Sequence, residues 1–222
     1  SNRISIYAEY LRKLLEEKKA YYCFCTEEEL EAERQSLLAQ GIAPKYSGRC
    51  RVLDESEVKE NLNKGGSHVI RFKVPETKII FKDIIRGNIK FDMGLVGDMV
   101  IAKNIDQPLY NFAVVVDDAI MKITHVIRGE DHLSNTPKQI VMAEALGFGL
   151  PEFAHMPIIL NPDRSKMSKR FSDTALRDYI NGGYLREAII NFIAFLGWHP
   201  KDDREVMTLD ELIKEFDLKR VQ

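Results

Sequence analysis

Apolar residues recur every three or four positions near the start of the chain, at Ile4, Tyr7, Leu11 and Leu14. This spacing places them on one side of a helix and predicts an amphipathic helix over 4–18. Thr26 followed by Glu29 has the spacing of a capping box, which satisfies backbone amides at the start of a helix. We therefore expect a second, very acidic helix that begins there and ends near Gly41.

The next apolar segments are shorter and are separated by glycine and proline. Alternation of apolar and polar residues with a period of two is typical of strands that bury one face. The pattern predicts short strands over 69–74, 79–85 and 96–101. Pro75 ends the first of them, because proline has no amide hydrogen to donate to a sheet.

A continuous apolar run follows Tyr110. Residues 112–116 carry no polar side chain, which is typical of a strand buried on both faces. Asp117 and Asp118 interrupt the run, and a second strand is expected over 121–127. We expect these two strands to form a hairpin.

The following segment predicts a strand–helix–strand unit. Thr136 and Pro137 supply an N-cap and a first-turn proline, so a helix is expected from there to Leu146, with Gly147 ending it. The apolar run 156–160 is the next expected buried strand. The unit over 121–160 therefore predicts an α/β fold with a right-handed parallel crossover.

Parallel strands also predict where a ligand binds, because ligands of open α/β sheets lie outside the carboxyl ends of the strands. Residues 128–132 follow one such strand, and the basic segment 166–170 follows the other. The antiparallel strand of the expected hairpin begins at the same edge, which adds Tyr110. We therefore expect Tyr110, Arg128 and the basic segment to surround one cleft.

The last part of the chain has helical apolar spacing, and helices are expected over 174–180, 185–196 and 209–216. Lys169, Arg170, Arg177 and Arg186 could contact nucleic-acid phosphates. For Arg177 and Arg186 we favour a solvated helix face.

Composition indicates ordinary soluble protein: 222 residues, 45% hydrophobic and 30% charged, enough for one large or two small domains. No stretch approaches the ~20 apolar residues of a membrane helix, and the start of the chain does not resemble a secretory leader. Three cysteines argue against a disulfide scaffold and fit the reducing cytoplasm. Because the net charge is only −2, any RNA contact must come from local basic patches.

The segment Lys166-Met167-Ser168-Lys169-Arg170 places three cations in a short polar loop. Ammonium groups on flexible stems suit the neutralisation of a triphosphate during attack at its α-phosphorus. The alternative is a solvated basic loop without a ligand.

Three further residues each admit two interpretations. Arg128 directly after a buried strand needs an anion, so it either clamps a substrate carboxylate or pairs with Glu130 or Asp131. Asp131 either accepts hydrogen bonds from a nucleotide or lies by the N-terminus of the next helix. Tyr110 either places its hydroxyl on a ligand or belongs to the core.

Five segments resemble, in order and spacing, bacterial-type glutamyl-tRNA synthetase, a class I aminoacyl-tRNA synthetase. They are residues 20–25 (AYYCFC), 46–50 (YSGRC), 108–118 (PLYNFAVVVDD), 125–132 (HVIRGEDH) and 166–170 (KMSKR). The last segment is similar to the KMSKS signature of class I enzymes. The likeness extends over essentially the whole chain.

The resemblance implies the second half of a class I Rossmann-type nucleotide-binding domain, formed by residues 1–22 and 106–165. It also implies an inserted α+β subdomain over 23–105 that binds the acceptor end of tRNA. The KMSKR loop and a helical stem-contact region would follow over 166–222.

The implied reaction joins L-glutamate to ATP as glutamyl-adenylate and transfers the glutamyl group to the 3′ end of tRNA(Glu). Tyr110 and Arg128 would contact glutamate, and Lys166 and Lys169 would be catalytic. The implied ATP contacts are Asp131, the backbone near Ile159, and Lys166, Met167, Ser168, Lys169 and Arg170. Positioning of the substrates and stabilisation of the developing phosphate charge would accelerate the reaction. Mg²⁺ would be bound together with ATP. We expect a cytoplasmic monomer that does not bind membranes.

Cys23, Cys25, Tyr46 and Cys50 resemble a zinc site of some relatives, in which thiolates and a tyrosine share the metal. Three thiolates alone leave a tetrahedral shell incomplete. Some relatives have histidine two positions after the third cysteine, where this chain has Val52. The alternative is a set of small buried cysteines without a metal.

The other signature of the family, the HIGH motif, does not occur in the 222 residues, since no histidine is followed two positions later by glycine. We therefore expect an internal fragment of a longer synthetase that is inactive alone and lacks the anticodon-binding region. The alternatives are a relative that glutamylates a modified tRNA base, a glutaminyl enzyme, and a non-catalytic RNA-binding module. The helical continuation after Arg170 favours the glutamate enzyme.

Overall fold

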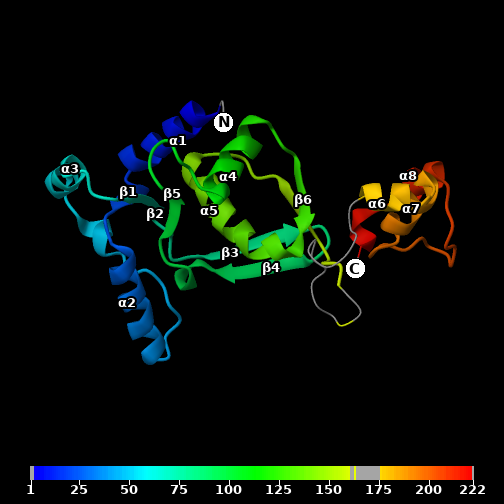
Figure 1. Cartoon of the computed structure of the whole chain (residues 1–222), viewed down its shortest axis with the longest axis horizontal. Coiled ribbons are helices and arrows are strands. Elements are labelled where there is room, and N and C mark those ends of the chain that lie inside the picture. Colours follow the sequence, from blue (N-terminus) through cyan, green and yellow to red (C-terminus); the bar gives the residue numbers. More distant parts are fainter. Residues whose placement is uncertain (1–2, 161–162, 164–175, 222) are drawn as a thin grey trace. The chain divides into compact units, whose positions relative to one another are not determined.

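The structure is a computed structural model that describes residues 3–160, 163 and 176–221 (Figure 1). The chain is a mixed α/β protein with two compact units. The first unit comprises Ser1–Phe81, Ile89–Thr124 and Ser134–Pro151, and the second comprises Lys82–Asn88, His125–Leu133 and Glu152–Gln222. Within the described ranges, no helix combines the length and the apolar character needed to cross a bilayer.

The first unit contains an antiparallel sheet with the strand order β1-β2-β5. The strands are β1 (Ala20–Cys23), β2 (Val69–Phe72) and β5 (Met99–Ala102). Between β1 and β2 lie α2 (Glu27–Ala39), the short 3-10 helix η1 (Arg49–Val52) and α3 (Glu55–Asn63). Helix α2 begins with the predicted capping box: Thr26 accepts from the amide of Glu29, whose carboxylate accepts from the amide of Thr26.

Three helices pack together in the first unit: α1 (Ile4–Glu16), α4 (Tyr110–Ile120) and α5 (Thr136–Leu146). Their fully buried apolar side chains include Leu11 and Leu14 of α1, Phe112 and Val116 of α4, and Met142 of α5. The predicted amphipathic helix near the start of the chain is confirmed, because α1 buries Tyr7, Ala8, Leu11 and Leu14. The predicted helix over 136–146, with Gly147 after it, is also confirmed.

The predicted hairpin over 112–127 is wrong. Residues Tyr110–Ile120 form helix α4, and the only strand of the pair is β6 (His125–Gly129). The buried residues of α4, Phe112, Val115 and Val116, follow helical spacing, which the continuous apolar run concealed. Because α4 is not an antiparallel strand, no hairpin brings Tyr110 to the edge of the sheet.

The second sheet has the strand order β4-β3-β7-β6, formed by β3 (Lys78–Asp83), β4 (Gly87–Asp92), β6 and β7 (Glu152–Met156). Strands β6 and β7 are parallel, as predicted, and place Arg128 opposite His155. Strand β3 also runs parallel to β7, with Asp83 opposite Phe153. The predicted strand over 156–160 is wrong: β7 ends at Met156, because Pro157 cannot donate to a sheet.

Three predicted helices of the last segment are confirmed as α6 (Leu176–Asn181), α7 (Arg186–Ala194) and α8 (Leu209–Glu215). They belong to the second unit, where Trp198 forms a buried apolar cluster with Met207, Leu212 and Val221. Ile85 and Met156, which follow β3 and end β7, pack against this cluster. Short 3-10 helices complete the described elements at Met93–Leu95 (η2), Glu130–Asn135 (η3) and Leu218–Arg220 (η4).

Candidate substrate and metal sites

Arg128 lies at the carboxyl end of β6, as the sequence predicts, and is half-buried. Its Nε donates a hydrogen bond to Nε2 of His155, its neighbour on β7, over 3.2 Å. His155 in turn binds the carboxylate of Asp83, with 2.6 Å between Nδ1 and Oδ2, and both of these side chains are fully buried. The carboxyl ends of three adjacent strands therefore carry one connected set of polar groups.

Glu130 connects two other segments of the second unit. Its carboxylate forms an ion pair with Arg86 at 2.6 Å and accepts a hydrogen bond from the amide of Ile158 at 3.3 Å. Glu130 therefore fixes the backbone that follows β7, directly before Ile159, whose backbone is an expected ATP contact. Ile159 itself is 48% exposed.

The remaining expected ligand contacts differ in how far the structure describes them. Tyr110 is the first residue of α4 and is 53% exposed, so its interpretation as a core residue is wrong. Asp131 is exposed and lies on the 3-10 helix η3. The basic segment Lys166, Met167, Ser168, Lys169 and Arg170 lies outside the described residues.

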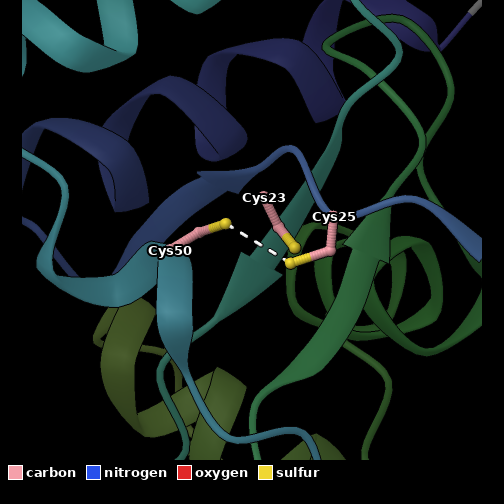
Figure 2. Close-up of side chains that lie close together, drawn as sticks. All are labelled: Cys23, Cys25 and Cys50. Carbon is pink, nitrogen blue, oxygen red and sulfur yellow. Dashed lines mark hydrogen bonds between the residues drawn. The ribbon is translucent and has the colours of Figure 1, made fainter. Parts of the chain in front are cut away.

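Cys23, Cys25 and Cys50 point their sulfur atoms toward one another in the first unit (Figure 2). All three Sγ atoms lie within 4.8 Å of one another, and those of Cys25 and Cys50 are 3.6 Å apart. The hydroxyl of Tyr46 lies 3.4 Å from the sulfurs of both Cys23 and Cys25. The structure thus brings together all four residues of the predicted quartet.

Local backbone geometry explains how Cys50 reaches this cluster. Gly48 precedes η1 with φ at 85°, a left-handed conformation that glycine adopts without strain. The amide of Cys50 then donates to the Tyr46 hydroxyl at 3.0 Å, and the amide of Phe24 donates to the Cys50 sulfur at 3.5 Å. These bonds hold the Tyr46 hydroxyl, from the loop before η1, and the Cys50 sulfur, from η1 itself.

The thiol pKa values of Cys23 and Cys25, which flank Phe24, are shifted in opposite directions. Burial raises the pKa of the Cys25 thiol to about 11. Burial acts in the same direction on Cys23, but hydrogen bonds from Tyr46 and Arg71 to its thiolate lower the pKa of that thiol. Burial and the neighbouring thiols raise the pKa of Tyr46, which keeps its hydroxyl protonated.

The geometry of these donors fits a tetrahedral zinc ion. With Zn–S bonds of about 2.3 Å, sulfurs that share a tetrahedral zinc lie about 3.8 Å apart. The 3.6 Å separation of the Cys25 and Cys50 sulfurs is close to that value. The hydroxyl of Tyr46 lies 3.4 Å from the Cys25 sulfur, near enough to be a fourth ligand. Thiolates are also the ligands that structural zinc sites prefer.

The family of the chain follows from comparison with known proteins. A family model described as tRNA synthetases class I (E and Q), catalytic domain, matches residues 1–222. The chain belongs to this family. The resemblance noted from its five segments is therefore confirmed, as is the α/β fold class.

Relatives of this class I synthetase chain include a glutamate–tRNA ligase of Sulfurihydrogenibium sp. (52% identical over 221 residues) and one of Natranaerobius thermophilus (53% over 222). Each alignment covers 100% of the chain and 46% of the relative. A crystal structure of the Elizabethkingia meningosepticum glutamate tRNA ligase, in complex with its amino acid, is 41% identical with a TM-score of 0.86. That match covers 99% of this chain and 49% of the other. The chain thus spans about half the length of the relatives it matches.

Sequence reasoning missed Asp83 and His155 of this synthetase chain. Each is a polar residue inside or beside an apolar run. Each also lies at or near the end of its strand, and the adjacent strands carry polar residues at the same end. Such residues are rarely buried unless they have a partner, so their position in the pattern was an available signal. Arg71 was missed in the same way: it lies within β2 and is 7% exposed.

Proposed function

We propose that this chain is part of a glutamate–tRNA ligase, which activates L-glutamate with ATP and transfers the glutamyl group to the 3′ end of tRNA(Glu). Arg128 carries the proposal: it lies at the carboxyl end of a parallel strand, where ligands of α/β sheets bind, and its guanidinium suits a carboxylate. The relatives named glutamate–tRNA ligase, similar over the length of the chain, support the choice of reaction.

In this proposal, Arg128 and Tyr110 bind glutamate. Asp131 and the backbone near Ile159 bind ATP, with Glu130 holding the adjacent amide of Ile158 in place. Lys166 and Lys169 neutralise the phosphates as pyrophosphate leaves, assisted by Met167, Ser168 and Arg170 of the same segment. Because the reaction needs little proton transfer by the protein, positioning and charge stabilisation supply the rate. Mg²⁺ accompanies ATP rather than occupying a protein cage.

We assign a separate role to each of three parts of the chain. Residues 1–22 and 106–165 contribute to the nucleotide-binding core, residues 23–105 hold the acceptor end of tRNA, and residues 166–222 contact its stem. Arg177 and Arg186 are exposed in this last part, which suits contact with solvent or with phosphates. We further propose a cytoplasmic monomer.

We also propose a structural zinc ion held by Cys23, Cys25, Cys50 and the hydroxyl of Tyr46. The metal would tie the end of β1 to η1 and to the loop before it, and thereby rigidify the segment proposed to hold the acceptor end. The mutual approach of three sulfurs and one hydroxyl supports this proposal.

Glutamate-dependent exchange of pyrophosphate into ATP, measured on the full-length gene product, tests the proposed reaction. We expect exchange with glutamate, and charging of tRNA(Glu) transcripts. Arg128→Ala removes the proposed carboxylate clamp and should abolish exchange, whereas Arg12→Ala, on the exposed side of α1, should leave it unchanged. Exchange with glutamine alone, charging only of a modified tRNA base, or RNA binding without exchange would each contradict the proposal.

A further inference from the structure

Arg128, His155 and Asp83 form a chain of hydrogen bonds across three adjacent strands. The bonds run from Arg128 Nε to His155 Nε2 (3.2 Å) and between His155 Nδ1 and Asp83 Oδ2 (2.6 Å). The order of the strands, β6, β7 and β3, is the order of the residues in the chain of bonds. His155 and Asp83 have 0% side-chain exposure, whereas Arg128 is only half-buried. The bonds therefore lead from the interior to the proposed substrate contact.

Asp83 is held as a hydrogen-bond acceptor. Its Oδ1 accepts from three backbone amides, those of Ile85 (3.0 Å), Arg86 (2.9 Å) and His155 (3.2 Å). Its Oδ2 remains for the imidazole of His155, so Nδ1 of His155 must carry a hydrogen. Each of these bonds favours the ionised carboxylate over the neutral acid.

The tautomer of His155 determines whether Arg128 faces a hydrogen-bond acceptor or a donor at Nε2. A neutral imidazole protonated at Nδ1 presents a lone pair at Nε2, and this lone pair accepts the hydrogen on Nε of Arg128. The opposite tautomer would direct an N–H group at the guanidinium, which has only donors. Asp83 thus makes His155 an acceptor for Arg128.

We propose that Asp83 and His155 are positioning residues, which orient the guanidinium of Arg128 for the carboxylate of the amino-acid substrate. The inference rests on the proposed function, in which Arg128 binds glutamate. A guanidinium is planar, so a hydrogen bond that fixes Nε also fixes the directions of the two terminal nitrogens. A bidentate contact with a carboxylate depends on those directions. The role of His155 is therefore orientation and not proton transfer.

Asp83→Asn isolates this effect, because the substitution preserves size and keeps Oδ1 as an acceptor for the three amides. The new amide group donates where Oδ2 accepted, and so drives His155 into the tautomer with hydrogen on Nε2. In the full-length protein, we expect the KM for glutamate to rise about tenfold, the effect of losing one hydrogen bond to a charged group. The KM for ATP should stay unchanged.

Two substitutions of His155 supply a matched pair. His155→Gln retains an oxygen that can accept from Arg128, whereas His155→Phe fills a similar space without an acceptor. We expect the KM for glutamate to rise in His155→Phe and to recover partly in His155→Gln. Nitrogen NMR of histidine-labelled protein, with His155 assigned by its absence from these variants, should show hydrogen on Nδ1 in the parent and on Nε2 in Asp83→Asn.

The outcomes separate this inference from the proposed function. If Arg128→Ala abolishes glutamate use while Asp83→Asn and His155→Phe keep the parental KM for glutamate, the positioning role is wrong and the proposed function stands. If these variants fold but raise the KM for both substrates equally, Asp83 and His155 are structural and the positioning role is likewise wrong. If Arg128→Ala leaves the KM for glutamate unchanged, both proposals fail.

Discussion

The guanidinium of Arg71 lies 4.0 Å from the centre of the Tyr46 ring, beside the cysteine cluster. Arg71 is 7% exposed and donates from Nη1 to the backbone carbonyl of Asp98 at 3.0 Å. A buried cation is unfavourable unless negative charge compensates it. Zinc held by three thiolates has a net charge of −1, so Arg71 and the proposed metal centre would neutralise one another.

The first prediction concerns the metal itself. Purified protein should contain about one zinc per chain, because the donors satisfy a tetrahedral shell. Cys50→Ser should lose the metal and lower the melting temperature, and a chelator should have the same effect on the parent protein. Elemental analysis and thermal unfolding with and without chelator measure this. Zinc-free protein that neither takes up the metal nor changes its melting temperature would rule the site out.

The second prediction tests the charge of Arg71. Arg71→Met keeps much of the side-chain volume but removes the positive charge, so the affinity for zinc should fall about 10- to 100-fold, as is usual for groups that support metal ligands. Arg71→Lys retains the charge and should recover part of the affinity. Competition with a chromophoric zinc chelator gives the affinities. Equal affinities in the parent protein and Arg71→Met would show that Arg71 serves packing alone.

The extent to which these features could be predicted depends on how local their signals are. The cysteine quartet lies in two short segments that resemble a zinc site of some relatives, so its members could be named before their contacts were known. Asp83 and His155 lie 72 positions apart and meet only because β3 pairs with β7, which no local pattern specifies. Sequence periodicity records which residues are buried, but not which strands become neighbours.

The error at Asp117 has a related cause. An aspartate after an apolar run is typical of a turn, yet Asp117 lies inside α4. Its carboxylate accepts hydrogen bonds from the hydroxyl of Tyr7 at 2.8 and 2.9 Å and from Nε of Arg3 at 2.8 Å. Both partners lie more than 100 positions earlier in the chain, so the reason for the aspartate was not visible nearby.

The third prediction follows from this contact between α1 and α4. Tyr7→Phe removes the hydroxyl that binds Asp117 and should lower the free energy of unfolding by about 1 kcal/mol. Tyr10→Phe is the matched control, because in the described ranges the Tyr10 hydroxyl makes no hydrogen bond. Urea unfolding of the two variants measures the difference. Equal stabilities would mean that the Tyr7 hydroxyl contributes nothing to the packing of α1.

The fourth prediction concerns Gly129, which ends β6. A Cβ atom at this position would lie 2.6 Å from Oδ1 of Asp131, too close for both to remain in place. Gly129→Ala should therefore displace the Asp131 carboxylate and raise the KM for ATP, with little loss of stability because a side-chain end can move. Gly149→Ala is the control, since nothing lies within 4 Å of its Cβ. A parental KM for ATP in Gly129→Ala would argue against Asp131 as a nucleotide contact.

The fifth prediction is an acid dependence of stability that Asp83 causes. Burial alone would raise the pKa of Asp83, but hydrogen bonds from the amide of Arg86 and from His155 outweigh burial and lower it. The folded-state pKa therefore lies below the unfolded value of about 4. Stability from Asp83 is fully present above that unfolded value and is lost as the pH falls through the lowered folded-state value.

Asp83→Asn cannot ionise and so should lack this part of the pH dependence. Its free energy of unfolding should be below that of the parent protein at neutral pH, and the difference should shrink as the pH falls below about 4. Trp198, the only tryptophan of the chain and 1% exposed within the same unit, reports the unfolding of this region by fluorescence. Urea titrations between neutral and acidic pH give both curves. Curves that stay parallel throughout would show that Asp83 has the same pKa in the folded and unfolded chain, and hence that its hydrogen bonds to His155 and the amides do not favour the carboxylate.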